Sequence, residues 1–135
     1  MKPSITVYEE SFQRRQMRLL AERERLRGET LALVMPKLYM IGQGHASEVS
    51  RLFIFGSLVN PGRFRPDSDI DVAVEWKQKG DYFGLWRELE EAIGRDVDFR
   101  ELGDDPFSQR VRAQGLTVYE SRSHQNAHLR DPRRS

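Results

Sequence analysis

One segment of eight residues constrains the fold of this chain more than any other. Apolar and polar residues alternate from Asp69 to Trp76, which is the period of a strand with one buried face. The buried face would carry the large apolar side chains Ile70, Val72, Val74 and Trp76. Because positions i and i+2 of a strand project from the same face, Asp69 and Asp71 would bring two negative charges close together on the other face. That arrangement is costly without a bound cation.

The rest of the chain predicts one domain of alternating helices and strands. Three further short segments are rich in β-favouring residues and are predicted strands: 52–55, 95–100 and 116–119. Helices are predicted after Asp81 and Asp105, which are N-cap residue types; the first would end at Gly94 and the second at Gly115. This order predicts an α/β (α+β) fold, with a mixed β-sheet of about four strands flanked by helices.

The N-terminal part of the chain lacks strand signals and has a helical spacing. Its apolar residues recur every seven positions: Phe12, Leu19, Leu26, Leu33 and Met40. The spacing predicts either one long helix or two, because Gly28 and Pro36 interrupt it. The glycines at 42 and 44 would end the helix.

Charge divides the chain into three parts. Residues 11–27 hold six Arg and two Glu, whereas residues 67–105 hold thirteen acidic and five basic residues. We expect a charged helical N-terminal arm over 1–30, a domain over 31–120 and a flexible basic tail over 121–135. The acidic residues therefore gather in the part of the domain that contains the alternating strand.

Residue usage excludes several classes of protein. The chain has no cysteine, so it has no disulfide framework, thiolate zinc site or cysteine nucleophile. It has no run of about 18 apolar residues and its N-terminus opens into charge, so we expect no membrane segment and a cytoplasmic location. A net charge of +1 gives no general attraction to nucleic acid or to anionic membranes.

A third carboxylate completes a predicted metal site. Asp98 occupies the like-facing position of a strand that could lie beside the strand of Asp69 and Asp71. Three carboxylates suit Mg²⁺ or Mn²⁺, and Mg²⁺ commonly shares its coordination between carboxylates and substrate phosphates. We therefore predict that Asp69, Asp71 and Asp98 are metal ligands and catalytic residues, and that the substrate carries phosphate.

A phosphate-binding turn is predicted directly after the strand 52–55. Gly56 lets the backbone approach a phosphate closely, its neighbouring N–H groups donate to anions, and the Ser57 hydroxyl adds a donor. With the carboxylates, the turn predicts attack of a hydroxyl on an α-phosphate while Gly56 and Ser57 hold the β- and γ-phosphates. The predicted reaction is nucleotidyl transfer.

These residues make the chain resemble the minimal nucleotidyltransferases of the DNA polymerase β superfamily. Three separated motifs carry the resemblance, and they occur in the family's order: Phe55-Gly56-Ser57, Arg65 to Val74, and Asp96 to Phe99. The resemblance runs from about residue 31 to residue 120. It implies a polymerase β-like nucleotidyltransferase fold, here with a long N-terminal helix.

The resemblance also implies roles and a partner. Gly56 and Ser57 would grip the triphosphate of ATP, Asp69 and Asp71 would bind Mg²⁺, and Asp98 would join the metal site and activate the acceptor hydroxyl. Stand-alone members of the family often act as antitoxins that adenylylate a tyrosine of a small helical HEPN ribonuclease. A HEPN-type toxin is therefore the implied protein partner, and AMP the implied group transferred.

The turn after Ser57 differs from the family pattern, in which an arginine often follows the serine closely. This chain has the run Leu58 to Gly62 there, so Arg63 or Arg65 would supply the guanidinium group that binds phosphate. The difference leaves an alternative function open. The alternative is a binding module that docks its partner, with or without bound nucleotide, and does not turn over.

The N-terminal arm has more than one interpretation. Its arginines between Arg14 and Arg27 could contact RNA, but the interspersed Glu22 and Glu24 fit an exposed helix with intrahelical ion pairs equally well. The apolar residues at seven-residue spacing could instead dock a partner or a second copy of the chain.

Overall fold

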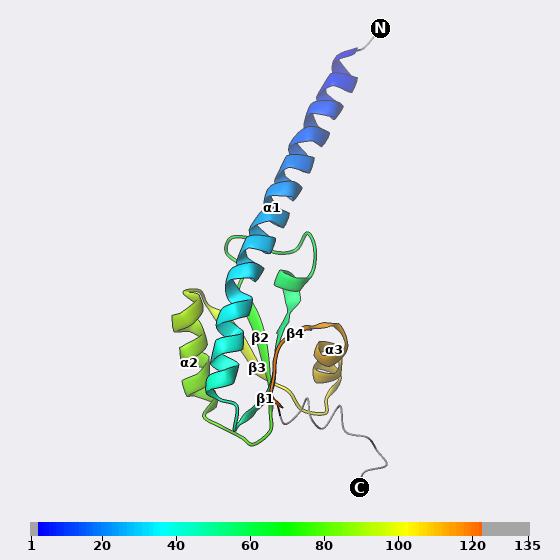
Figure 1. Ribbon diagram of the computed structural model, residues 1–135. Coiled ribbons are helices and arrows are strands. Elements are labelled where there is room, and N and C mark those ends of the chain that lie inside the picture. The colour runs from blue at the N-terminus through cyan, green and yellow to red at the C-terminus, as the bar shows by residue number, and fades with distance from the viewer. Residues whose placement is uncertain (1–2, 123–135) are drawn as a thin grey trace.

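A computed structural model describes residues 3–122 of the 135-residue chain. Its centre is a four-stranded sheet in the order β3-β2-β1-β4 (Figure 1). The strands are β1 (Val49–Phe55), β2 (Ile70–Trp76), β3 (Val97–Glu101) and β4 (Leu116–Glu120). β1 is antiparallel to both β2 and β4, whereas β2 is parallel to β3. The predicted mixed sheet of an α+β fold is confirmed, whereas the proposed tail from residue 123 onwards lies outside the described residues.

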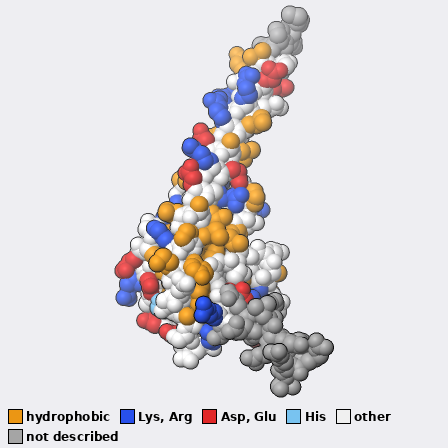
Figure 2. All heavy atoms as spheres, in the orientation of Figure 1, with side chains coloured by type: hydrophobic (Ala, Val, Ile, Leu, Met, Phe, Trp, Pro, Cys, Tyr) orange, Lys and Arg blue, Asp and Glu red, His pale blue; other side chains and the backbone are white. Residues whose placement is uncertain are grey.

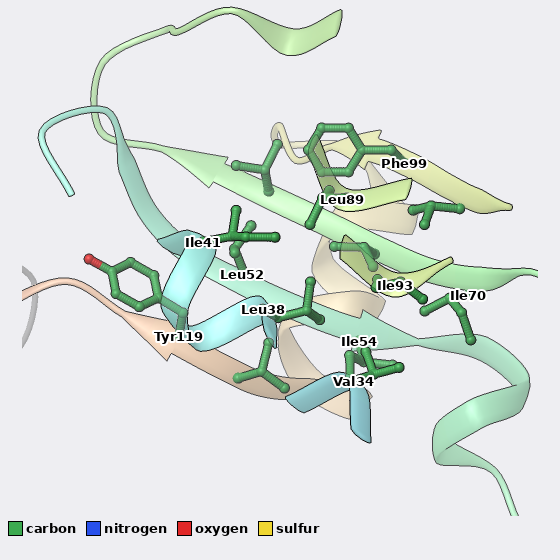
Figure 3. Close-up of a cluster of buried hydrophobic side chains, with 14 of the residues drawn as sticks. Val34, Leu38, Ile41, Leu52, Ile54, Ile70, Leu89, Ile93, Phe99 and Tyr119 are labelled. Carbon is green, nitrogen blue, oxygen red and sulfur yellow. The ribbon is translucent and has the colours of Figure 1, made fainter. Parts of the chain in front are cut away.

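Two helices cover one face of this sheet and form the main core with it (Figure 3). They are α1 (Pro3–Gly44), through its C-terminal half, and α2 (Tyr82–Ile93). The apolar residues of β2 face these helices, as the alternation predicted, and Ile70, Val72 and Val74 are fully buried. Asp81 caps α2 by accepting a hydrogen bond from the Gly84 N–H. This core holds the strands that carry the predicted site residues in a fixed register.

The N-terminal helix is continuous, although the sequence allowed either one helix or two. α1 runs unbroken through Gly28 and Pro36. Pro36 and Ala32 are both exposed residues of α1, so the helical hydrogen bond that Pro36 cannot donate to Ala32 is missing on the side of the helix that water reaches. Gly42 does not end the helix but lies inside it. It packs directly against Tyr119 of β4, since an added Cβ would stand 2.3 Å from the ring of that residue. The first of the two glycines therefore permits close packing against β4, and the helix ends at Gly44.

The N-terminal half of α1 extends beyond the domain as a single helix (Figures 1 and 2). Large apolar side chains are exposed along it, among them Tyr8, Phe12, Met17 and Leu19. Contact with the domain begins at Glu24, which binds the N–H of Gly62, and Thr30 is the first buried residue among those whose burial the structure describes. Despite its 42 residues, neither α1 nor any other helix within residues 3–122 has an apolar stretch that could cross a bilayer.

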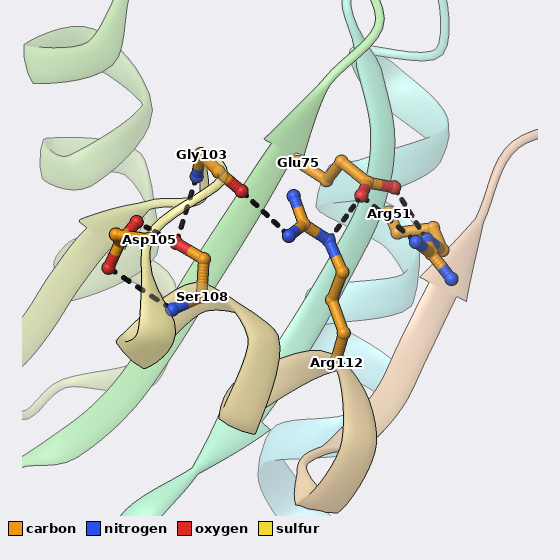
Figure 4. Close-up of polar contacts among 6 residues, drawn as sticks. All are labelled: Arg51, Glu75, Gly103, Asp105, Ser108 and Arg112. Atoms are coloured by element: carbon orange, nitrogen blue, oxygen red, sulfur yellow. Dashed lines mark hydrogen bonds and ion pairs between the residues drawn. The ribbon is translucent and has the colours of Figure 1, made fainter.

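The other face of the sheet is covered in part by α3 (Pro106–Gln114). Val111 packs there against Phe53 and Ala73 in a second small core. Charged contacts fix the helix as well: Glu75 of β2 binds Arg112 of α3 at 2.8 Å and Arg51 of β1 at 2.6 Å (Figure 4). α3 leaves the end of this face near Asp71 uncovered, and the predicted site residues lie there.

Candidate active site

Gly56 and Ser57 form a tight turn at the end of β1, where the 3₁₀ helix η1 (Gly56–Val59) begins. Gly56 has a φ of +73°, which is the left-handed region that favours glycine. An added Cβ at this position would stand 2.1 Å from Oδ2 of Asp71. The backbone N–H of Ser57 donates a hydrogen bond to the same carboxylate. The predicted phosphate-binding turn therefore contacts Asp71 of β2, one of the predicted metal ligands.

The strand pairing brings two of the predicted carboxylates side by side. Asp71 of β2 pairs with Phe55 of β1 on one side and with Asp98 of β3 on the other. Val97 and Phe99 are buried in the main core, so Asp98 points to the opposite face, which it shares with Asp71. Asp69 lies one residue before β2 begins and acts on Asp71 electrostatically. All three carboxylates thus belong to the same end of one sheet face.

The carboxylate of Asp71 is poorly solvated and crowded by like charge. Burial and the nearby negative charges of Asp98 and Asp69 raise the pKa of Asp71 to about 6. The hydrogen bond from the Ser57 N–H and the positive charge of Arg100 oppose this shift without cancelling it. A hard cation would neutralise the excess charge, and carboxylate oxygens are the ligands that Mg²⁺ and Mn²⁺ prefer. The donor set therefore fits the metal that the sequence predicts.

Asp98 is engaged by an arginine that the sequence interpretation did not consider. Arg100, two residues further along β3, binds Asp98 through its Nε at 2.8 Å and its Nη2 at 3.3 Å. This hydrogen bond and charge raise the pKa of Arg100. Within residues 3–122 no three carboxylate or imidazole groups converge closely enough to form a metal-binding cluster. The metal site of Asp69, Asp71 and Asp98 therefore stays a prediction, and Asp98 would have to leave Arg100 to join it.

The phosphate-binding turn is held in place from α1. Arg27 donates a hydrogen bond to the backbone oxygen of Leu58 at 3.2 Å, and Glu24 accepts one from the N–H of Gly62 at 2.5 Å. Glu24 and Arg27 also bind each other at 2.8 Å. In the sequence they resemble an ordinary i,i+3 ion pair of an exposed helix. No sequence signal distinguishes them, because their targets lie more than thirty residues away.

The loop between the turn and β2 contains Arg63 and Arg65, which the sequence interpretation assigned to phosphate. Both side chains are exposed. The loop is fixed by Arg95, whose guanidinium group donates to the backbone oxygens of Pro66 and Ser68. Neither Arg63 nor Arg65 lines the cavity beside Gly56, so their role in phosphate binding stays a prediction.

A cavity of about 160 Å³ lies beside Gly56, between η1 and α3. Phe55, Val59 and Phe107 give it an apolar floor, whereas Asn60, Arg110 and Gln114 are its polar side chains. The rings of Phe55 and Phe107 meet edge to face with centroids 5.3 Å apart. Sequence reasoning missed this group, because α3 follows β1 by some fifty residues and carries no phosphate-binding motif.

The sequence matches the model of one protein family. This is the polymerase beta, nucleotidyltransferase family, and the match covers residues 37–124, which is more than half of the chain. The matched segment contains the turn at Gly56 and the three aspartates. No curated protein matches the chain by sequence.

Solved structures with a similar fold include toxin–antitoxin complexes. A toxin–antitoxin structure with AMP-PNP aligns with a TM-score of 0.55 and 23% identity over 69% of this chain and 78% of that one. A complex of tri-AMPylated Shewanella oneidensis HEPN toxin with MNT antitoxin aligns with a TM-score of 0.52 and 22% identity over 71% and 77%. The MntA–HepT toxin–antitoxin structure aligns with a TM-score of 0.52 and 22% identity over 71% and 78%. At these identities the likeness shows a shared fold.

Proposed function

Because this chain belongs to the polymerase beta nucleotidyltransferase family, we propose that it transfers AMP from ATP to a hydroxyl group of a partner protein, with Mg²⁺ as cofactor. The observation that carries this proposal is the contact between the turn at Gly56 and Asp71, with Asp98 paired to Asp71 on the next strand. A triphosphate held by the turn would place its α-phosphate beside these carboxylates.

Each side chain has a role in this reaction. The backbone of Gly56 and the backbone and hydroxyl of Ser57 would bind the β- and γ-phosphates. Asp69 and Asp71 would hold Mg²⁺, which supplies Lewis-acid stabilisation of charge on the phosphates. The acceptor oxygen attacks the α-phosphorus, the bond from that phosphorus to the bridging oxygen breaks, and pyrophosphate leaves. Asp98 takes the acceptor's proton once it is released from Arg100.

The acceptor is proposed to be a HEPN-type toxin, with this chain as its antitoxin. The support is the fold shared with MNT antitoxins, one of which is in complex with a tri-AMPylated HEPN toxin. The cavity beside Gly56 is small, about 160 Å³, and residues 3–122 contain no separate acceptor-binding domain. A partner protein that brings its own hydroxyl to the open end of the sheet face would complete the site.

The experiment that tests this proposal uses ATP labelled at either the α- or the γ-phosphate. The protein is incubated with labelled ATP, Mg²⁺ and a candidate HEPN-type partner protein. Transfer of AMP places the α-label on the partner and leaves the γ-label in free pyrophosphate. Asp69→Asn should abolish labelling, whereas Asp104→Asn, an equal charge change on an exposed loop, should preserve it. Labelling of the partner by the γ-label alone would contradict the proposal.

A second candidate function is neutralisation of the partner by docking alone. It is favoured by the pairing of Asp98 with Arg100 and by the lack of an arginine between residues 58 and 62. The double variant Asp69→Asn, Asp71→Asn separates the two functions. If co-expression of this variant still suppresses the partner's toxicity, docking is sufficient; if suppression is lost while the complex still forms, nucleotide transfer is required.

A further inference from the structure

The cavity beside Gly56 has the composition of an anion site. Among its lining residues one is charged, Arg110 of α3, and none is acidic. The amide side chains of Asn60 and Gln114 lie at the same cavity, and Asn60 is oriented by a hydrogen bond to the Gly56 backbone oxygen at 2.6 Å. The local charge around this part of the phosphate-binding turn is therefore positive, although the sheet face beside it is acidic.

Within residues 3–122, Arg110 has no side-chain partner, which it shares with Arg63 and Arg65 of the loop and which distinguishes it from three other arginines around the site. Three guanidinium groups are paired with carboxylates: Arg27 with Glu24, Arg100 with Asp98, and Arg112 with Glu75. Arg110 makes no side-chain hydrogen bond or ion pair with any other residue in the described part of the chain. Its five N–H donors are available to a ligand.

The helix that carries Arg110 is firmly placed. Asp105 caps α3 by accepting hydrogen bonds from Ser108, and Arg112 joins the helix to Glu75 of β2. The cavity residues Phe107, Arg110 and Gln114 recur at i, i+3 and i+7 and so lie on one side of the helix. Arg110 is thus presented to the cavity by a rigid element, whereas Arg63 and Arg65 are carried by a loop.

The order of the strands indicates which part of a nucleotide would reach this cavity. Asp98, Asp71 and Gly56 follow one another across β3, β2 and the end of β1, and the cavity lies next, towards β4. An acceptor oxygen near Asp98 would attack from the β3 side. In an in-line displacement the pyrophosphate departs on the opposite side, which is the side of the cavity.

We infer that Arg110 binds the terminal phosphates of the nucleotide and is a phosphate-positioning residue of this site. The inference rests on the proposed function, because it assumes that a nucleoside triphosphate occupies the turn at Gly56. It assigns to α3 the guanidinium group that the turn itself lacks. A planar fork of N–H donors matches phosphate oxygens in a way that a lysine does not.

The test compares the affinities of ATP, AMP and pyrophosphate for the purified full chain in the presence of Mg²⁺, measured by calorimetry. Arg110→Gln should weaken ATP and pyrophosphate binding about 10- to 100-fold and leave AMP binding unchanged, because AMP has no terminal phosphates. Arg110→Lys should restore part of the loss. The matched control is Arg87→Gln, which removes an exposed arginine from α2 on the other side of the sheet. This variant should bind ATP, AMP and pyrophosphate with wild-type affinity.

The outcomes separate this inference from the proposed function. Unchanged ATP affinity in Arg110→Gln, with a loss in Arg63→Gln or Arg65→Gln, would overturn the assignment and return the role to the loop. An equal loss of ATP and AMP affinity would also overturn it, because the cavity would then hold the nucleoside. Failure of the wild-type chain to bind ATP would overturn both proposals. An unchanged unfolding temperature for Arg110→Gln shows that the fold is intact.

Discussion

Gly56 and Asp71 are packed so closely that the glycine hydrogen occupies the space where any other residue would place a carbon against the carboxylate. An added Cβ would stand 2.1 Å from Oδ2 of Asp71. The phosphate-binding turn and the acidic strand are therefore one unit. A change in the backbone of the turn therefore moves the carboxylate.

Gly56→Ala should displace Asp71 and remove nucleotide binding. Gly62→Ala is the matched control, because Gly62 also has a positive φ, +81°, but nothing lies within 4 Å of an added Cβ. Both variants carry a left-handed backbone cost of about 1 kcal/mol. Of the two variants, only Gly56→Ala should abolish Mg²⁺-dependent ATP binding, measured by calorimetry. Equal ATP affinity in the two variants would show that the contact with Asp71 is unimportant.

Asp71→Asn should stabilise the metal-free protein at neutral pH while it removes metal binding. The pKa of Asp71 is raised from 3.8 to about 6, so the contribution of this group to stability is full below pH 3.8 and is lost as the pH rises through 6. The amide carries no charge at pH 7. The free energy of unfolding should therefore rise by about 1 kcal/mol, after discounting for the solvent exposure of a half-buried group.

Urea unfolding at pH 7 and at pH 4 measures this effect. The increase in the free energy of unfolding that Asp71→Asn brings should be large at pH 7 and small at pH 4, where the wild-type carboxyl is protonated. Saturating Mg²⁺ should shrink the gain at pH 7, because a cation relieves the repulsion in the wild-type protein. A gain that is the same at both pH values would contradict the electrostatic explanation.

Glu75→Gln should loosen α3 and make the protein less stable at neutral pH. Hydrogen bonds from Arg51 and Arg112 lower the pKa of Glu75 to about 2. The stabilisation is therefore present above 4.5 and is lost as the pH falls from 4.5 towards 2. At pH 7 the variant should lose about 2 kcal/mol, typical of hydrogen bonds to a charged group. The difference in unfolding temperature between Glu75→Gln and wild type should become smaller in acid. The control Glu91→Gln changes an exposed glutamate and should have the wild-type unfolding temperature at every pH.

Arg27→Met should weaken ATP binding without contacting the nucleotide. Arg27 holds the backbone oxygen of Leu58 in the turn and orients Glu24, which holds Gly62. Loss of these contacts should lower ATP affinity about 10-fold, as expected when a phosphate-binding backbone loses its support. Arg25→Met changes an exposed arginine two residues away and should leave affinity unchanged. Unaltered ATP binding in Arg27→Met would show that the turn is rigid by itself.

Removal of residues 1–21 tests the other half of α1. Residues 12–22 are exposed along their whole length, so their removal takes away no buried contact of the domain. The unfolding temperature of the domain should therefore be unchanged, and ATP affinity should be preserved because Glu24 and Arg27 remain. A lower unfolding temperature that depends on protein concentration would instead indicate that the arm joins two copies of the chain.

Local sequence patterns determined the secondary structure and the family. The alternation from Asp69 to Trp76, the caps at Asp81 and Asp105, and the glycine at 94 each depend on the backbone within a few residues. They could be interpreted without the rest of the chain, because side-chain direction in strands and hydrogen bonding at helix ends are local properties. The spacing of the turn and the aspartates was sufficient to identify the polymerase beta nucleotidyltransferase family.

Only the tertiary structure decided which arginines stand near the phosphate-binding turn and which are free. Arg27, Arg100 and Arg110 look alike in the sequence, yet one holds the turn, one pairs with Asp98 and one lines the cavity without a partner. Long flexible cations can reach many acceptors, and the one that they meet depends on how distant elements pack. The sequence therefore identified the chemistry of the carboxylates, whereas packing of α1 and α3 against the sheet selected the cations around them.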